Sequence, residues 1–483
     1  MSNLAGTTFD AVDRLLVGGD WIAGKGAPLE VIDKYRLQPG ARFHAADREQ
    51  VALAVDRAHA AFRSGAPNPY ERGAILQRAS ALLETRADAF VRTMQMEAGF
   101  TASDAAGEVR RGAETLRLSA EEARRLAGDV IPLAGAPQQA GRMGFTLRVP
   151  LGVVVAITPF NSPLNTVAHK IAPAFAAGNA VILKPASATP LTACLLAETL
   201  LDAGMPRGFL SLTPGGAQVA DWLIADPRVR FFAFTGSTEV GRSIQQRAGL
   251  RRTQMELGSI ACTILCDDAR LDTALPKVVN AGYRKAGQVC TSVQLLLTHR
   301  SILGDVQARL AQLVRDLPYG DPADPKTVVG PLISEKEAIR VESWIAEAVS
   351  RGASCLAGGG ARRGAVVPPA LLTSIDETMK LGCEEVFGPV VCILPFDTLD
   401  QAIDRVNATP FGLATGIFTN RLDDAFNAAR RLEVGGVHVN ETSSSRVDLM
   451  PYGGSKDSGF GREGPRYAVH EMTEERVITF TLG

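Results

Sequence analysis

Two residues of this 483-residue chain have the side chains and the surroundings that nucleophilic catalysis requires. Cys290 lies in residues 287–292 (GQVCTS), between a helical stretch and an apolar strand. A free cysteine is most often a small buried hydrophobe, and it becomes a nucleophile only with a lowered pKa or a nearby base. No histidine stands near it in the sequence, so Glu256, at a strand-to-loop junction, is the candidate base.

Three further segments have side chains suited to a nucleotide. In residues 234–238 (FTGST), a strand ends and a helix opens, so free N–H groups and a hydroxyl face a common point where a phosphate fits. Lys184 follows an apolar strand, and residues 384–389 (EEVFGP) offer two acids and an aromatic ring. An ordinary capped helix, a solvated lysine and a charged turn remain the alternatives. No G-x-G-x-x-G follows an early strand, so a standard Rossmann pyrophosphate loop is not expected.

The elements that position these residues alternate between apolar β-branched runs and helical periodicity, which is typical of an α/β fold. The expected strands are 152–158, 180–183, 229–234, 262–265, 293–298, 390–395 and 436–440. The expected helices are 48–62, 74–98, 189–203, 237–248, 271–286 and 333–350.

Residues 131–150 and 476–482 depart from this alternation. The first segment is rich in Gly and Pro and becomes β-forming at 145–149, and the second (RVITFTL) also reads as a strand. Both are predicted to be exposed edge strands that need a partner, with an ordinary surface hairpin as the alternative.

Composition excludes several classes of protein. A formal net charge of −1 argues against a charge-driven nucleic-acid or membrane binder. The longest apolar stretches, such as 151–157, are too short to span a membrane, and residues 1–10 lack the pattern of a secretory signal. Seven scattered cysteines show no zinc or redox spacing, so no metal site is expected and a cytoplasmic protein is the simplest interpretation.

Seven motifs in order give a more specific identification than any one of them. They are 158–161 (TPFN), 184–187 (KPAS), 234–238 (FTGST), 256–258 (ELG), 287–290 (GQVC), 384–389 (EEVFGP) and 451–461 (PYGGSKDSGFG). Together they closely resemble the NAD(P)-dependent aldehyde dehydrogenase superfamily over nearly the whole chain. The resemblance implies two Rossmann-like parallel-sheet domains and a small β oligomerisation arm. The dinucleotide-binding domain would comprise 1–130 and 151–258, the catalytic domain 259–465, and the arm 131–150 and 466–483.

The resemblance also implies catalytic roles. Cys290 matches the family's nucleophile, which forms a thioester with the substrate. Asn161 matches the amide that stabilises the oxyanion, together with the backbone N–H of Cys290. Glu256 matches the base that activates water for hydrolysis of the thioester.

On the cofactor side, Lys184 resembles the residue that holds the adenosine ribose, Ser237 the pyrophosphate contact, and Glu385 and Phe387 the nicotinamide-side contacts. The other expected cofactor contacts are Ile157, Thr158, Pro159, Phe160, Ser187, Phe234, Thr235, Gly236 and Leu257. Many NAD-preferring relatives have Glu at the place of Ser187, where a carboxylate would repel a 2′-phosphate. NADP is therefore the expected cofactor, with NAD possible. At Ser259, most relatives have a second Gly.

Substrate expectations follow from Arg284, six residues before Cys290, where succinate-semialdehyde dehydrogenases have an arginine that binds the substrate carboxylate. A second arginine of those enzymes corresponds to His169 here, and Ser445 and Arg446 are further candidates. A short aldehyde with a distal anionic group, such as succinic semialdehyde, is expected.

A CoA-acylating enzyme and a non-catalytic binding or structural member of the fold are the alternatives. A homodimer or homotetramer is expected from the arm.

Overall fold

Parallel, almost entirely buried strands form the centre of the first lobe. The structure, a computed structural model, describes residues 15–481. The sheet of this lobe has the strand order β2-β1-β9-β8-β7-β10-β11-β21, and the five strands from β9 to β11 are parallel. Its strands are β1 (Leu15–Val17), β2 (Asp20–Ile22), β7 (Val153–Ile157), β8 (Ala180–Lys184), β9 (Leu210–Leu212), β10 (Val229–Thr235), β11 (Arg252–Glu256) and β21 (Gly459–Phe460).

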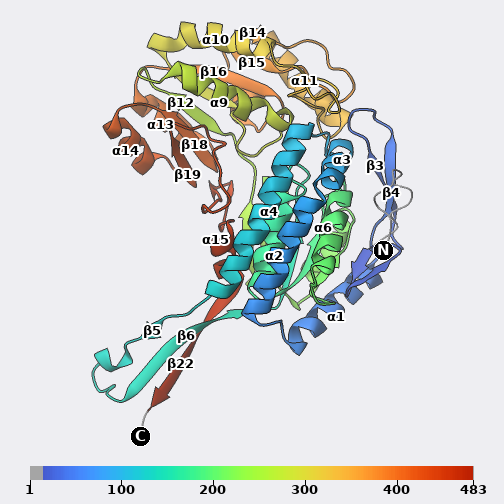
Figure 1. Cartoon of the computed structure of the whole chain (residues 1–483). Helices are drawn as coiled ribbons and strands as arrows, with labels where there is room; N and C mark the ends of the chain where they lie inside the picture. The colour runs from blue at the N-terminus through green and yellow to red at the C-terminus, as the bar shows by residue number, and fades with distance from the viewer. Residues whose placement is uncertain (1–14, 482–483) are drawn as a thin grey trace.

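Helices cover this sheet and bury its apolar side chains (Figure 1). They are α1 (Arg48–Ser64), α2 (Pro69–Thr85), α3 (Ala87–Ala98), α4 (Ala102–Arg125), α5 (Asn165–Ala176), α6 (Pro190–Asp202), α7 (Ala217–Ala225), α8 (Thr238–Ala248) and α15 (Pro465–Glu471). A separate hairpin joins β3 (Pro28–Ile32) and β4 (Pro39–His44).

The second lobe has its own hydrophobic core around a seven-stranded sheet in the order β14-β15-β16-β13-β12-β18-β19. The strands are β12 (Cys262–Leu265), β13 (Leu295–His299), β14 (Ser354–Ala357), β15 (Ala370–Thr373), β16 (Val390–Phe396), β18 (Ala414–Phe418) and β19 (Gly436–Val439). The helices are α9 (Leu271–Tyr283), α10 (Leu303–Arg315), α11 (Glu335–Ser350), α12 (Lys380–Cys383), α13 (Leu399–Ala408) and α14 (Leu422–Arg431). The short strands β17 (Phe411–Gly412) and β20 (Ser455–Lys456) pair with each other.

A three-stranded sheet projects from the first lobe (Figure 1). It is formed by β5 (Val130–Ile131), β6 (Arg142–Pro150) and β22 (Thr473–Thr481), in the order β22-β6-β5. The two segments predicted to be edge strands thus pair with each other, and the rings of Phe145 and Phe480 stack at 6.0 Å between centroids. We call this sheet the arm.

The predicted α/β fold with Rossmann-like parallel sheets is confirmed, and most predicted strands and helices lie within two or three residues of their expected bounds. Three expectations need correction. The single helix expected over 74–98 is two helices that meet at Arg86. The helix expected to reach residue 286 ends at Tyr283, because Lys285 and Ala286 have φ of 52° and 55°. Residues 466–472 were assigned to the arm, but Ala468, Val469 and Met472 pack in the core of the first lobe.

Candidate active site

The carboxyl ends of β7, β8, β10 and β11 open onto a cavity of about 940 Å³ that both lobes line. This edge of a parallel sheet is where α/β folds bind ligands. Most of the residues predicted for catalysis and cofactor binding line the cavity: Ile157, Thr158, Pro159, Phe160, Asn161, Lys184, Phe234, Thr235, Gly236, Ser237, Glu256, Leu257, Cys290, Glu385 and Phe387. Ser187 is not among them, although its neighbours Ala186 and Ala188 are, and its hydroxyl donates to the Gly215 carbonyl at 3.0 Å.

A second, smaller cavity of about 40 Å³ adjoins the first at the nucleophile. The two cavities share Asn161, Thr235, Glu256 and Cys290, so these four residues stand where a cofactor on one side would meet a substrate on the other. We call the smaller space the substrate cavity. Its polar lining includes the predicted Arg284 and Arg446 and the hydroxyl of Ser444, and also Arg111 and Tyr452, which sequence reasoning did not select.

The loop that presents Cys290 is held by a close backbone approach. Gly287 has a φ of +71°, and a Cβ atom there would lie 2.0 Å from the carbonyl oxygen of Gly388. Only glycine fits such a position without strain. The preceding turn, with left-handed Lys285 and Ala286, redirects the chain after α9 so that Cys290 faces the shared part of both cavities.

The surroundings of Cys290 favour the neutral thiol over the thiolate. Burial and the neighbouring Glu256 carboxylate raise the pKa of the thiol well above its ordinary value, while a contact with Tyr452 opposes that rise. The Cys290 Sγ and the Tyr452 hydroxyl oxygen are 2.9 Å apart. Burial, together with the negative charge of Glu463, raises the pKa of Glu256 toward neutrality. A carboxyl group with such a pKa can accept and release a proton near pH 7, as a general base must.

Asn161 reaches the nucleophile loop directly. Its side-chain Nδ2 donates to the backbone carbonyl of Gln288 at 2.8 Å, and the backbone carbonyl of Asn161 accepts from Lys285 Nζ at 3.0 Å. An amide has two N–H groups, so one remains available for an oxyanion beside Cys290.

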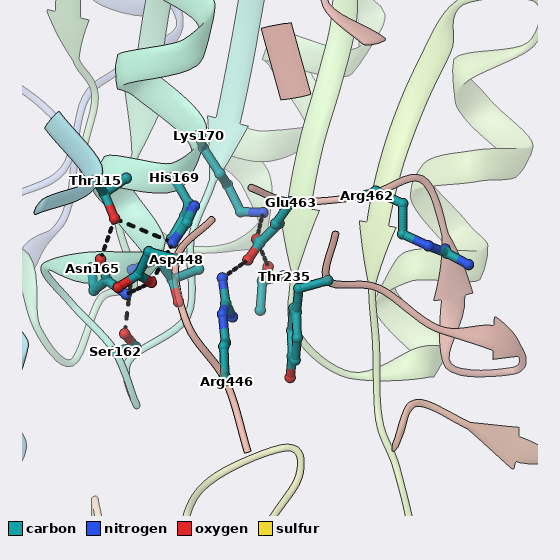
Figure 2. Close-up of polar contacts among 12 residues, drawn as sticks. Thr115, Ser162, Asn165, His169, Lys170, Thr235, Arg446, Asp448, Arg462 and Glu463 are labelled. Atoms are coloured by element: carbon teal, nitrogen blue, oxygen red, sulfur yellow. Dashed lines mark hydrogen bonds and ion pairs between the residues drawn. The ribbon is translucent and has the colours of Figure 1, made fainter. Parts of the chain in front are cut away.

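Lys170, Glu463 and Arg446 form an ionic network inside the protein (Figure 2). Glu463 accepts from Lys170 Nζ at 2.8 Å and from Arg446 Nη2 at 2.9 Å. Although burial alone would raise it, the charges of Lys170 and Arg446 hold the pKa of Glu463 well below its usual range. The Arg446 guanidinium lies over the Tyr452 ring, with Cζ 3.8 Å from the centroid. This network therefore contacts the ring whose hydroxyl touches Cys290.

His169 does not occupy the substrate position expected of it. The side chain is fully buried, lines neither cavity, and places Nε2 2.8 Å from Asp448 Oδ1. Asp448 also forms an ion pair with Arg111 at 2.7 Å (Figure 2 shows the His169 contact). Helix α5 is buried along its whole length, and the His169 side chain on it therefore packs inside the protein. His169 is thus linked to the lining residue Arg111 only through their shared partner Asp448 among the described residues.

Among the described residues, Arg284 is the arginine of the substrate cavity that forms no ion pair. Arg111 and Arg446 each pair with a carboxylate. Within residues 15–481, Arg284 forms no ion pair, and its Nη2 donates to the Ser444 hydroxyl at 2.7 Å. Burial lowers the pKa of its guanidinium from the ordinary value. The lining hydroxyl is that of Ser444, one residue before the predicted Ser445, which is not among the lining residues.

Several groups of the larger cavity suit a dinucleotide. Helix α8 begins there, and its N-cap Ser237 makes no side-chain capping bond, so N–H groups of the first turn are available to a pyrophosphate. Lys184 is buried, and within residues 15–481 its ammonium donates a single hydrogen bond, to the Pro185 carbonyl at 3.4 Å. Burial lowers the pKa of this ammonium to about 8. Glu385 accepts from the Ser259 N–H at 3.0 Å, and the rings of Phe160 and Phe387 meet edge to face at 5.8 Å. The donor set and the volume fit NAD(P).

Comparison with known proteins decides the family. The aldehyde dehydrogenase family matches residues 21–478. The chain belongs to the aldehyde dehydrogenase family. It is 45% identical over 469 residues to a 3-sulfolactaldehyde dehydrogenase of Priestia aryabhattai, which covers 97% of this chain and 98% of that protein.

Solved structures of aldehyde dehydrogenases superimpose closely on this one. Aldehyde dehydrogenase 21 of Physcomitrella patens, in complex with its reaction product succinate, has a TM-score of 0.95 and 37% identity, with 99% of each chain covered. A glyceraldehyde-3-phosphate dehydrogenase of Methanocaldococcus jannaschii, complexed with NADP, has a TM-score of 0.90 and 35% identity, with 94% of this chain and 99% of that chain covered. The protein is therefore an NAD(P)-dependent aldehyde dehydrogenase. Within the described residues, no helix is long and apolar enough to cross a membrane.

Proposed function

We propose that this aldehyde dehydrogenase oxidises a short aldehyde with a distal anionic group, with 3-sulfolactaldehyde ranked first and succinic semialdehyde second. The observation that carries the proposal is the unpaired Arg284 guanidinium in the substrate cavity. The Arg284 guanidinium is half-buried and forms no ion pair within residues 15–481, although the Asp104 and Glu108 carboxylates act on it from a greater distance. An anionic substrate would give it a directly contacting partner. Arginine binds sulfonate and carboxylate oxygens through several N–H groups at once.

The related proteins support an anionic substrate. The name 3-sulfolactaldehyde denotes a three-carbon aldehyde with a sulfonate, and this relative has the highest identity of the three compared. Succinate and glyceraldehyde 3-phosphate likewise carry an anionic group away from the reacting carbon. We rank the sulfonate first because of that identity, while the expectation of succinic semialdehyde rests on the position of Arg284 and on a more distant likeness.

The proposed reaction begins with transfer of the Cys290 thiol proton to Glu256. The sulfur then attacks the aldehyde carbon, and the carbonyl π pair becomes an oxyanion held by the second N–H of Asn161 and the backbone N–H of Cys290. The bound nicotinamide supplies the acceptor for the hydride, which leaves a thioester on Cys290. Glu256 next releases the thiol proton to solvent and takes a proton from water, whose oxygen attacks the thioester carbon and releases the acid and the thiolate. The thiolate then takes the proton back from Glu256, which restores the starting enzyme. The sum is aldehyde, water and NADP⁺ to acid, NADPH and H⁺.

We further propose that NADP is preferred over NAD. Ser187 stands where a carboxylate would repel the 2′-phosphate, and the Lys184 ammonium forms no ion pair within residues 15–481. Lys184 would hold the adenosine ribose and its phosphate, the first turn of α8 the pyrophosphate, and Glu385 the second ribose.

The arm and the cysteines bear on the oligomeric state and the cellular compartment of the enzyme. Leu147, Val477 and Phe480 on the arm are exposed, which supports our proposal that the arm joins subunits in a homodimer or homotetramer. All seven cysteines are free, which supports a reducing compartment such as the cytoplasm.

An aldehyde panel with both cofactors tests the proposed function. We expect kcat/KM for 3-sulfolactaldehyde or succinic semialdehyde to exceed that for propanal, which has no anionic group, by about 10-fold or more. Equal values for propanal would contradict the anionic substrate. Added CoA should leave the carboxylic acid as the product, and formation of an acyl-CoA would favour the acylating alternative.

A further inference from the structure

Tyr452 is the residue whose hydroxyl touches the sulfur of Cys290, at 2.9 Å. The side chain is 6% exposed, and its backbone pairs with Glu463 through two hydrogen bonds, Tyr452 N–H to the Glu463 carbonyl at 3.0 Å and Glu463 N–H to the Tyr452 carbonyl at 2.7 Å. The phenol is therefore fixed in its contact with the nucleophile.

The Arg446 guanidinium packs against the face of the Tyr452 ring. The guanidinium lies 3.8 Å above the ring centroid, and Glu463, itself held by Lys170, fixes it there (Figure 2). A cation over an aromatic face withdraws electron density from the ring. The O–H bond of the phenol is thereby polarised, and it becomes a better hydrogen-bond donor.

A hydrogen-bond donor at this position would stabilise a thiolate that the surroundings of Cys290 otherwise disfavour. Cys290 is half-buried beside the carboxylate of Glu256, and both its desolvation and that charge disfavour a thiolate. The charged groups around the sulfur are Glu256 from β11, Arg284 after α9, and Arg446 from the segment before Tyr452, with Glu463 and Lys170 behind them. Of the uncharged groups, the Tyr452 hydroxyl lies at hydrogen-bonding distance from Sγ.

We propose that the Tyr452 hydroxyl, polarised by Arg446, is a catalytic hydrogen-bond donor that stabilises the Cys290 thiolate before it attacks the aldehyde. The proposal rests on the proposed role of Cys290 as the nucleophile. The thiol proton passes to a carboxylate oxygen of Glu256, and the phenol keeps its own proton while it donates to the sulfur. When the sulfur electron pair forms the bond to the carbonyl carbon, the negative charge moves to the oxyanion and the bond from Tyr452 weakens.

The charges of the site support this direction of donation. The contact with Tyr452 lowers the pKa of the thiol, against burial and Glu256. The same contact, with burial as the larger cause, raises the pKa of Tyr452 well above its ordinary value, so the phenol stays protonated and able to donate. A thiol that donated to the phenol oxygen would instead be stabilised in its neutral form, and loss of the hydroxyl would then lower its pKa.

Alkylation of Cys290 as a function of pH separates these cases. The rate of iodoacetamide labelling is followed by mass spectrometry of the peptide that contains Cys290, in the wild-type enzyme and in Tyr452→Phe. The phenyl ring keeps the contact with Arg446 and loses only the hydroxyl. Tyr70→Phe is the matched control, because Arg124 also lies over the Tyr70 ring, at 5.2 Å, on an exposed surface.

We expect the apparent pKa of Cys290 to rise by about one unit or more in Tyr452→Phe and to stay unchanged in Tyr70→Phe. Site-specific replacement of Tyr452 by 3-fluorotyrosine, a more acidic phenol, should lower the apparent pKa of the thiol. An unchanged or lowered pKa in Tyr452→Phe would overturn the proposal. Because labelling does not require aldehyde turnover, it tests this contact separately; activity retained in Cys290→Ala would instead contradict the nucleophile.

Discussion

Lys285 forms a buried ion pair with Glu108, with Nζ 2.7 Å from a carboxylate oxygen. The same ammonium donates to the backbone carbonyl of Asn161, while Glu108 accepts from the Ser162 hydroxyl and from the backbone N–H of Asn165. One ion pair thus joins the segment that carries Cys290 to the segment that carries Asn161. Both partners are almost completely buried, at 7% and 2% side-chain exposure.

Replacement of Lys285 by Met should therefore impair both stability and catalysis. It leaves the Glu108 charge buried and unpaired, so we expect the free energy of unfolding in urea to fall by about 3–5 kcal/mol. A shift of the two segments should also lower kcat by about 100-fold. The control is Arg117→Ala, which removes exposed ion pairs with Glu114 and Glu121 and should cost about 1 kcal/mol or less. Equal effects of the two variants would contradict the role of the buried pair.

The anionic substrate makes a prediction for Arg284→Leu. Loss of a charge-assisted hydrogen bond should raise KM for 3-sulfolactaldehyde or succinic semialdehyde by about 10- to 100-fold and leave KM for propanal nearly unchanged. Arg284→Lys should recover part of the affinity, because it keeps the charge but loses the planar fork. Steady-state kinetics with both types of aldehyde measure the difference. A rise of the same size for propanal would show that Arg284 only supports the fold.

The surroundings of Glu256 predict the pH dependence of hydrolysis. Burial and the charge of Glu463 raise its pKa, so the carboxylate that activates water is lost when pH falls below neutrality. The rate of thioester hydrolysis should therefore rise with pH through the neutral range and level off above it. Glu256→Gln should abolish this dependence and lower the steady-state rate. A hydrolysis rate that is flat from pH 5 to 8 in the wild type would contradict this assignment.

Cofactor preference can be tested at one position. The wild-type enzyme should have the higher kcat/KM with NADP, and Ser187→Glu should lower the NADP value by about 10-fold or more, because a carboxylate near the 2′-phosphate repels it. Ser187→Ala is the matched control and should change little, since the hydroxyl bonds only to the Gly215 carbonyl in the described structure. A preference of the wild type for NAD of about tenfold or more would contradict the proposal.

The sequence predicted the strands better than the turns between them. Apolar runs such as that of β7 (Val153–Ile157) have a strong local pattern, because a central parallel strand is buried on both faces. The end of α9 has no such local signal. There the chain turns through left-handed Lys285 and Ala286, and the stabilising contacts come from Glu108 and Gly388, which are distant in sequence.

In the candidate site too, the sequence predicted the residues of motifs but not the contacts that only the folded chain creates. The motif residues Cys290, Glu256 and Asn161 were selected from sequence, and the structure brings them to one point. Tyr452 was missed as a site residue although it stands within the 451–461 motif, because nothing in that segment indicates that its hydroxyl meets the sulfur. His169 was placed on the substrate side, yet its helix is buried and its partner is Asp448.

The most direct test of the account is to trap the thioester. Glu256→Gln, given NADP and succinic semialdehyde, should form the thioester more slowly than the wild type, because solvent must then accept the thiol proton. Hydrolysis should be slower still, so NADPH absorbance should show a burst close to one per active site, followed by slow turnover. Mass spectrometry of the quenched protein should find the acyl group on the peptide that contains Cys290. A burst with the acyl group on another residue, or activity retained in Cys290→Ala, would contradict the account.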